Sequence, residues 1–142
     1  MKTYSLFLPS ESSWGKLPLT PLGRNQFKLE ATAFAEKGLF YHDIIEAKIS
    51  LGKGLRFVRL VERSGLRVFR FLLSEVLTDS EVFKVFLQRV EAHGGYWEQF
   101  FGGILLVHLS RGSACRPKSE LQALLQSLDC GVTYHNLTFH QP

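Results

Sequence analysis

Two amphipathic helical patterns interrupt the second half of this chain, and strand-like segments stand on either side of each. The strand-like segments are 66–74, 96–101, 104–109 and 132–139. The order from residue 66 is therefore strand, helix, strand, strand, helix, strand. That order predicts a ferredoxin-like split βαβ arrangement for residues 64–142.

Local signals mark where these helices begin and end. Thr78 followed by Glu81 matches a capping box, and Gly94-Gly95 ends the apolar pattern that follows it. Pro117 suits the first turn of the second helix. Gly102-Gly103 predicts a hairpin turn between the two middle strands. The helical positions are Val82, Phe83, Phe86, Leu87 and Val90, and then Leu121, Leu124, Leu125 and Leu128.

The first half is rich in short strands and lacks a helical pattern. Its turns are predicted at Gly23-Arg24-Asn25 and Gly52-Lys53-Gly54, and the prolines of 9–23 are expected to break regular structure there. Several short strands in so few residues predict a small barrel-like sheet. We therefore expect an α+β fold, with a strand-rich subdomain at 1–63 packed on the subdomain at 64–142 as one compact unit. The strands are expected near 3–8, 14–20, 26–31 and 55–62, and within 38–50, where Gly38 is a turn before a strand that contains Ile44 and Ile49.

The bulk composition sets limits on the class of protein. With 142 residues and 45% apolar side chains, the chain suits one domain with a packed core. Cys115 and Cys130 are too few for a disulfide framework, and two free thiols are typical of a reducing compartment. The N-terminal apolar run is too short for a secretion signal, and no run is long enough to cross a bilayer. These features predict a cytoplasmic protein with no membrane partner.

Positive charge is concentrated in residues 53–70. This basic segment carries six Lys and Arg residues and one acid, a net +5 in a chain whose total is +4. Its two strands, joined by a tight turn at 63–65, are predicted to form a hairpin, and such a concentration of charge indicates a binding surface. The alternative is that these arginines cover apolar edges and pair internally with carboxylates.

Strand alternation places Arg56 and Arg59 on opposite faces of the first basic strand. Arg63 and Arg67 fall beside the boundary of the two halves, where internal ion pairs are expected. We therefore take Arg56, Arg59 and Arg70 as the ligand-facing candidates. The aromatic anchor candidates, chosen because Trp and Tyr dominate binding hot spots, are Trp14, Tyr96 and Trp97.

No residue set in the sequence predicts catalysis or a cofactor. The histidines lie far apart, without Cys or carboxylates at metal-ligand spacing, so no metal site is predicted. His42-Asp43 could form an oriented base, but such a pair more often belongs to a turn. Cys115, near a helix N-terminus, lacks a base beyond His108, and His135 has no assigned chemistry. Phosphate-binding Gly-rich loops, GxSxG, HExxH and CxxC are missing from the sequence.

Residues 12–73 resemble an uncharacterised bacterial family, domain of unknown function 4265. The similarity lies in Trp14 with the segment 18–47, and in 55–70. The matching positions are Leu22-Gly23, Phe27, Leu29, Phe34, Gly38, Asp43, Glu46-Ala47, Gly65 and Arg70. The resemblance implies a small soluble bacterial protein and carries no catalytic residues with it. This chain departs from the family's typical members in being basic.

Together these features favour a non-enzymatic protein-binding protein. Its most concrete form is a bacterial immunity protein that neutralises a cognate toxin with an acidic surface, since such a protein needs a rigid charged face and no chemistry. One alternative is a nucleic-acid-binding module that uses the 53–70 hairpin. Another is a small-molecule sensor or enzyme with a pocket between the subdomains.

Overall fold

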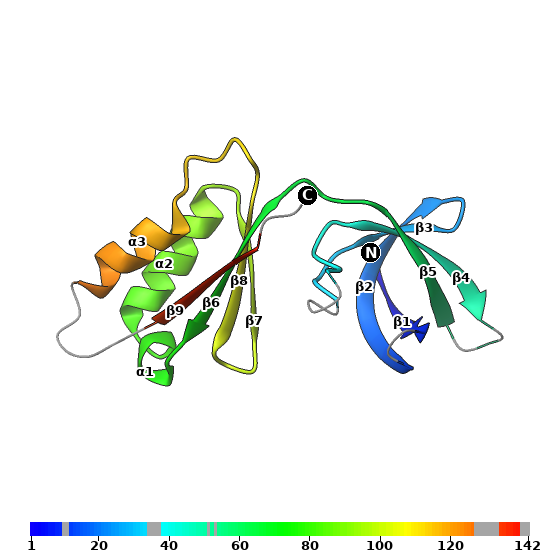
Figure 1. The fold of residues 1–142 in the computed structure, drawn as a ribbon, viewed down its shortest axis with the longest axis horizontal. Coiled ribbons are helices and arrows are strands. Elements are labelled where there is room, and N and C mark those ends of the chain that lie inside the picture. The colour runs from blue at the N-terminus through cyan, green and yellow to red at the C-terminus, as the bar shows by residue number, and fades with distance from the viewer. Residues whose placement is uncertain (10–11, 34–37, 51, 53, 127–133, 140–142) are drawn as a thin grey trace. The chain divides into compact units, whose positions relative to one another are not determined.

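The chain has an α+β, strand-rich fold that divides into two compact units (Figure 1). The computed structural model describes residues 1–9, 12–33, 38–50, 52 and 54–126, together with the backbone of 134–139. The units are Met1–Ser64 and Gly65–Pro142. The expectation that they pack together as one body stays a prediction.

The first unit is a closed five-stranded barrel. Its strands, in barrel order, are β1 (Lys2–Leu8), β2 (Ser13–Gly23), β3 (Gln26–Leu29), β4 (Ile44–Ser50) and β5 (Gly54–Glu62). Neighbours pair antiparallel except β1 and β5, which close the barrel in parallel. Alternate residues point inward and form the core, which consists of Leu6, Leu8, Leu17, Leu19, Leu29, Ala33, Leu39, Ile45, Ala47 and Leu55.

Barrel closure depends on a glycine at the start of β5. Gly54 has φ +109°, and a Cβ there would lie 2.6 Å from the carbonyl oxygen of Ser5 on β1. Because real Cβ atoms do not approach backbone oxygen so closely, any other residue would push β5 away from β1. This close approach sits directly beside the Leu6–Leu55 pairing that seals the barrel.

The expected break at the prolines of 9–23 is wrong, because β2 runs through both Pro18 and Pro21. Pro21 stands next to the register shift between β2 and β3, and Pro18 precedes Leu19, the first residue paired with β3. Proline is tolerated where the ladder is irregular or one-sided. The predicted turn at Gly23-Arg24-Asn25 is confirmed, with positive φ at all three residues.

The second unit is a four-stranded sheet with helices on one face (Figure 1). Its sheet order is β7-β8-β6-β9, and the neighbouring strands pair antiparallel. The predicted hairpin at Gly102-Gly103 is confirmed between β7 and β8. The elements are β6 (Arg67–Leu73), α1 (Glu75–Thr78), α2 (Glu81–Ala92), β7 (Tyr96–Phe100), β8 (Ile104–Leu109), α3 (Pro117–Leu125) and β9 (Tyr134–Phe139).

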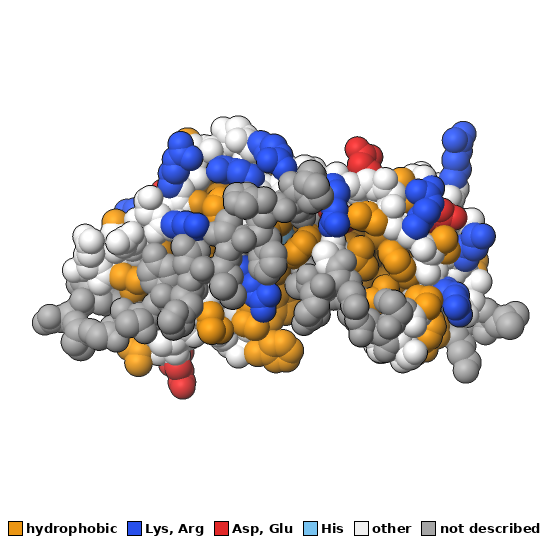
Figure 2. Space-filling model, in the orientation of Figure 1, with side chains coloured by type: hydrophobic (Ala, Val, Ile, Leu, Met, Phe, Trp, Pro, Cys, Tyr) orange, Lys and Arg blue, Asp and Glu red, His pale blue; other side chains and the backbone are white. Residues whose placement is uncertain are grey.

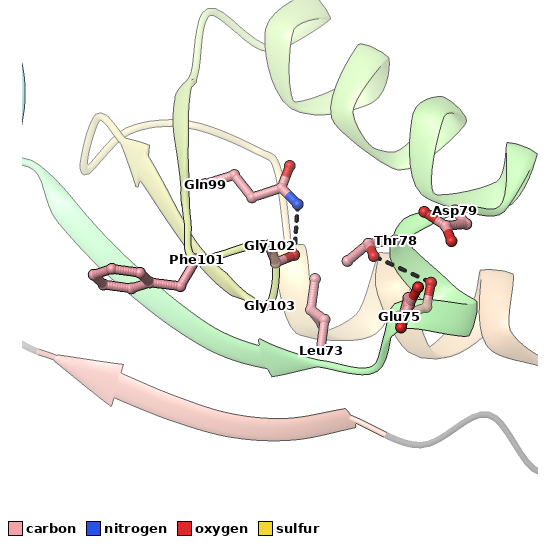
Figure 3. A pocket seen from close by; sticks show the side chains of 8 residues that line it. All are labelled: Leu73, Glu75, Thr78, Asp79, Gln99, Phe101, Gly102 and Gly103. Atoms are coloured by element: carbon pink, nitrogen blue, oxygen red, sulfur yellow. Dashed lines mark hydrogen bonds between the residues drawn. The ribbon is translucent and has the colours of Figure 1, made fainter.

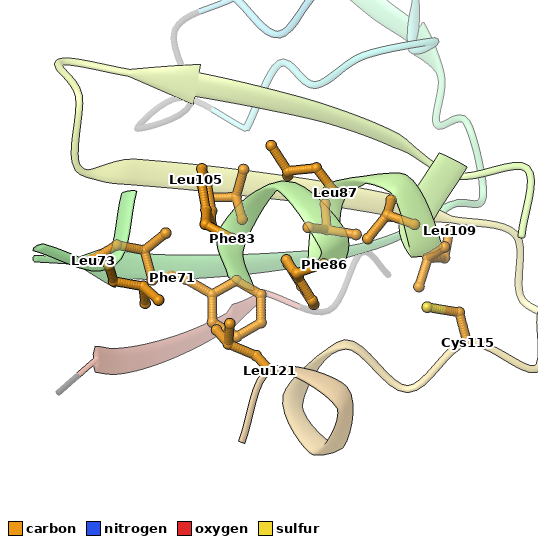
Figure 4. Close-up of a cluster of buried hydrophobic side chains, with 12 residues drawn as sticks. Phe71, Leu73, Phe83, Phe86, Leu87, Leu105, Leu109, Cys115 and Leu121 are labelled. Atoms are coloured by element: carbon orange, nitrogen blue, oxygen red, sulfur yellow. The ribbon is translucent and has the colours of Figure 1, made fainter. Parts of the chain in front are cut away.

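The core of this unit lies between the helices and the sheet (Figure 4). Phe86 of α2 meets Phe71 of β6 edge to face, with ring centroids 6.2 Å apart. Leu121 of α3 is also fully buried there, as the leucine stripe predicts, whereas Leu128 lies outside the described residues. Cys115, in the loop before α3, is also buried in this core cluster.

The predicted capping residue of α2 is wrong by two positions. Ser80, not Thr78, is the N-cap, and its hydroxyl accepts the backbone N–H of Phe83 at 3.2 Å. Thr78 instead ends the short helix α1, which Ser74 caps by accepting the N–H of Leu77. Thr78 and Ser80 are both residue types that cap helices well. Because Thr78 is the last residue of α1, Ser80 is the one that caps α2.

The hairpin predicted for the basic segment 53–70 is also wrong. β5 pairs with β1 and β4 in the barrel, whereas β6 pairs with β8 and β9 in the other sheet. The residues between them, 63–66, are not part of a strand. Each of these strands satisfies its backbone hydrogen bonds within its own sheet. Residues 53–70 therefore do not form one hairpin that could act as a single binding surface.

Candidate binding surfaces

Four side chains form a row across the outside of the barrel. In the strand pairings Trp14 of β2 stands opposite Phe7 of β1, Phe7 opposite Arg56 of β5, and Arg56 opposite Lys48 of β4. We call this set the barrel row. Residues directly opposite on neighbouring strands share a face, so all four point away from the core. In Figure 2, Lys and Arg side chains stand beside apolar ones on the surface of the barrel unit.

The contacts within the barrel row are aromatic at one end and cationic at the other. The rings of Phe7 and Trp14 have centroids 5.0 Å apart, and the Arg56 guanidinium carbon lies 5.5 Å from the Phe7 ring centroid. Trp14 remains 46% exposed. Among the residues that the structure describes, neither Arg56 nor Lys48 has a carboxylate within ion-pair distance.

Arg59 lies on the same outer face as Arg56, contrary to the prediction from alternation. The register of β4 and β5 shifts twice, so that Arg56 stands opposite Lys48 and Arg59 opposite Glu46, two residues along one side of β4. The shift leaves Val58 without a counterpart, and such a bulge reverses the alternation beyond it. Arg59 Nε donates to Glu46 Oε1 at 2.8 Å, so its charge is already balanced.

Arg63 is internal, as expected for residues beside the boundary. Its guanidinium donates to the carbonyl of Gly38 and lies 3.4 Å from Asp43 Oδ2. Asp43 is fully buried and also accepts the backbone N–H groups of Phe40 and Ser64. Burial raises the pKa of Asp43 by more than these donors and Arg63 lower it.

His42 does not pair with Asp43 as an oriented base. Its Nε2 lies 3.2 Å from Glu30 Oε1, and its ring stacks on Tyr41 with centroids 3.7 Å apart. Burial alone would raise the pKa of Glu30, but the Thr20 hydroxyl and the charges of Lys28 and His42 outweigh it and hold that pKa below its usual value. This cluster lies on the barrel wall, where Thr20, Lys28 and His42 all interact with the Glu30 carboxylate.

The other sequence candidates lie on two opposite faces of the second unit's sheet. Tyr96 and Arg70 point away from the helices, beside the buried His108–Glu98 pair, whose Nε2 and Oε1 are 2.7 Å apart. Trp97 points to the helix side, packs on the core and donates Nε1–H to Glu91 at 3.1 Å. Tyr96 and Trp97 therefore belong to different surfaces. His135 belongs to β9, of which the structure describes only the backbone.

Arg67 occupies the helix side of the same sheet. It donates to the carbonyl of Ser113 at 3.2 Å and its guanidinium lies over the Phe69 ring, 5.5 Å from the centroid. Within the described part of the chain Arg67 has no carboxylate partner, so the ion pair expected for it is not seen there.

A donor cluster that the sequence did not reveal lies beside Cys115. One ring nitrogen of His93, Cys115 Sγ and a carboxylate oxygen of Glu120 all lie within 4.8 Å of one another. Burial raises the pKa of the Cys115 thiol, the Glu120 carboxylate raises it further, and Arg67 lowers it. His93 is 22 residues from Cys115 in the sequence, so no spacing rule could have joined it to Cys115 and Glu120.

A cavity of about 490 Å³ lies where β6, α1 and the β7–β8 turn meet (Figure 3). Two of its polar side chains are used locally, since Gln99 donates to the carbonyl of Gly102 at 2.6 Å and Thr78 to that of Glu75 at 3.2 Å. Phe101, in the turn, has φ +52° and is 98% exposed. The lining holds no cysteine, serine, lysine or histidine. It consists of Leu73, Glu75, Thr78, Asp79, Gln99, Phe101, Gly102 and Gly103.

No family model and no curated protein match the chain. The resemblance to domain of unknown function 4265 therefore stays a prediction. A solved structure of a hypothetical protein from Neisseria gonorrhoeae is similar, with a TM-score of 0.52 and 18% sequence identity over 89% of this chain and 86% of that one. At this level of identity the similarity shows the fold alone. Within the described residues, no helix is both long and apolar enough to span a membrane.

Proposed function

We propose that this chain is a non-enzymatic protein-binding protein whose barrel row docks on an acidic patch of another protein. Its most concrete form is a bacterial immunity protein that neutralises a cognate toxin in the cytoplasm. The observation that carries the proposal is the continuous row of Trp14, Phe7, Arg56 and Lys48 across four strands.

The row has the composition of an interface hot spot. Trp and Arg are the side chains most enriched in hot spots, and here a half-exposed Trp14 and an exposed Arg56 are both braced by Phe7. Strands of a closed barrel hold these side chains in fixed positions. Less side-chain entropy is then lost on binding than from a mobile loop.

The charge of the row favours an acidic partner. Arg56 and Lys48 stand directly opposite each other on β5 and β4, and like charges in that position repel. An incoming carboxylate would relieve the repulsion and form charge-assisted hydrogen bonds with Arg56. Arg59, balanced by Glu46, adds less to such an interface.

The test is co-expression with the product of the neighbouring open reading frame. We expect rescue of growth and co-purification, and a Trp14→Ala or Arg56→Glu variant that weakens binding by at least about 30-fold. The matched control is Arg24→Glu, which makes the same charge change in the exposed β2–β3 turn. Failure of both rescue and co-purification, or wild-type affinity in both row variants, would overturn the proposal.

Nucleic acid is the second candidate, because an arginine over an aromatic ring also binds unpaired bases. It predicts retention on single-stranded RNA or DNA at low salt. It also predicts an affinity that falls steeply with salt and a shallower dependence in Arg56→Ala. Absence of binding at low ionic strength excludes it and leaves the protein-binding proposal standing.

We also propose the ferredoxin-like arrangement for the second unit. The sheet order β7-β8-β6-β9, the antiparallel pairing and the placement of both long helices on one face support it. Membership of the family named domain of unknown function 4265 is proposed on the sequence resemblance of residues 12–73.

A further inference from the structure

We propose that His93, Cys115 and Glu120 bind one Zn²⁺ ion, with water as the fourth ligand. The three donors come from separate places in the second unit: the C-terminal cap of α2, the loop before α3 and the first turn of α3. A zinc ion there would join the two long helices at one end of the core.

The spacing of the donors is close to that of a zinc site. With zinc–ligand bonds of about 2.0 to 2.3 Å, ligand atoms in a tetrahedral site lie about 3.3 to 3.8 Å apart. The three donor atoms lie within 4.8 Å of one another before any ion is placed. His93 is exposed and Glu120 is partly exposed, so both side chains have more room to rotate toward an ion than the buried Cys115 has.

His93 is prepared to ligate through one nitrogen. Its Nδ1 lies 2.8 Å from the carbonyl oxygen of Arg89, so Nδ1 carries the proton and Nε2 keeps a free lone pair. Such a second hydrogen bond is the usual way in which proteins orient a zinc-binding histidine. The helix end is itself fixed, since Gly95 donates to Val90, and a Cβ at Gly95 would lie 2.7 Å from a Leu109 methyl carbon.

Glu120 supplies the second observation that favours a cation site. Its Oε2 is buried and has no hydrogen-bond partner among the described residues. A buried carboxylate oxygen without a partner is costly, and an ion is one of the ordinary explanations for it. With Zn²⁺ bound, the charges of a Cys115 thiolate and the Glu120 carboxylate cancel those of the ion, so the centre is neutral beside an apolar core.

The donor types favour zinc over other divalent ions. A thiolate with an imidazole disfavours Mg²⁺ and Ca²⁺, which prefer oxygen ligands. Cysteine sulfur, histidine nitrogen and glutamate oxygen each bind zinc, and in a site with three protein ligands a water completes the tetrahedron. The alternative that the test must exclude is a plain core thiol at Cys115 with no ion bound between it and Glu120.

The test uses full-length protein stripped of metal with a chelator, then titrated with Zn²⁺ against a chromophoric competitor. We expect one ion per chain, and at least about tenfold weaker binding in each of His93→Gln, Cys115→Ser and Glu120→Gln. With Co²⁺ as the probe, wild type should show a thiolate-to-cobalt absorption band that Cys115→Ser removes. Zn²⁺ should also raise the unfolding midpoint of the second unit, followed by Trp97 emission.

Two variants serve as matched controls. Cys130→Ser removes the chain's other thiol and Glu81→Gln an exposed carboxylate of α2, and both should bind Zn²⁺ as wild type does. No bound Zn²⁺, or wild-type affinity in His93→Gln, overturns the site. Loss of binding in Cys130→Ser with retention in Cys115→Ser does so too. Because His93 is exposed, its variant decides the matter even if Cys115→Ser fails to fold.

Discussion

The two units bury a carboxylate in different ways. In the barrel, Asp43 accepts hydrogen bonds from the backbone N–H groups of Phe40 and Ser64, and it forms an ion pair with Arg63. In the second unit, Glu98 meets the side chain of His108 across neighbouring strands, with 2.7 Å between Oε1 and Nε2. The first arrangement fastens segments of main chain to one another, whereas the second joins two side chains on a sheet whose backbone is already paired.

The two units therefore differ in how far their backbone structure depends on the buried carboxylate. The segments around Asp43 lie outside the regular strand ladder, so the carboxylate supplies hydrogen bonds that β-sheet structure does not. β7 and β8 are paired along their length as backbone neighbours, so we expect their ladder to persist without the Glu98 side chain. Trp14 and Trp97, one in each unit, allow the two to be followed separately in Trp97→Phe and Trp14→Phe backgrounds.

Removal of the barrel carboxylate should have the largest effect. Asp43→Ala leaves two backbone donors without their acceptor and removes the carboxylate beside the Arg63 guanidinium, and we expect it to lower the free energy of unfolding by about 3 kcal/mol. Urea unfolding followed by Trp14 emission measures this. The control is Glu62→Ala, an exposed carboxylate at the end of β5, with an expected change below about 0.5 kcal/mol. Equal losses of unfolding free energy in the two variants would contradict the special role of Asp43 in the barrel.

Weakening the side-chain pair should cost less. Glu98→Gln keeps an acceptor for His108 but loses the charge, so we expect a loss of about 1 kcal/mol in unfolding followed by Trp97 emission. Glu75→Gln, an exposed carboxylate in the same unit, should change little. If Glu98→Gln lost as much unfolding free energy as Asp43→Ala, the sheet face that points away from the helices would also depend on one carboxylate.

The smallest effect should appear in the pH dependence of the barrel. The folded-state pKa of Glu30 is lowered, so its ionisation adds stability above the ordinary value of 4.5 and that stability is lost as pH falls through the folded-state pKa. The difference between wild type and Glu30→Gln, followed by Trp14 emission, should therefore shrink on acidification from a value below about 1 kcal/mol. Asp43 acts in the opposite sense, because its raised pKa gives a contribution that is lost as pH rises. A difference that grows on acidification would contradict this assignment.

Much of the strand and helix order follows from local patterns in the sequence. Alternation, turn glycines and the apolar stripes predict the strand-rich first half and both long helices. The face of Arg59 could not be predicted, since a bulge at Val58 depends on how β4 and β5 pair and has no signal within β5. The separation of β5 from β6 likewise depends on which partners each strand finds.

The candidate sites divide in the same way. Trp14 and Arg56 were chosen from residue type, but Phe7, which links them, is visible only once β1 lies between β2 and β5. His93, Cys115 and Glu120 meet only because α2 and α3 pack side by side on one sheet face. Residue type therefore nominates single side chains, and tertiary pairing decides which of them act together.

The parallel contact between β1 and β5 limits how early the barrel can close while the chain is being synthesised. Leu6 can meet Leu55 only after the intervening residues have left the ribosome, which takes a few seconds at about 5 to 20 residues per second. Until then one edge of β1 is open to pairing with strands of other nascent chains. Gly54 is what allows that edge to be covered at all, because a Cβ at this position would lie 2.6 Å from the carbonyl oxygen of Ser5 on β1.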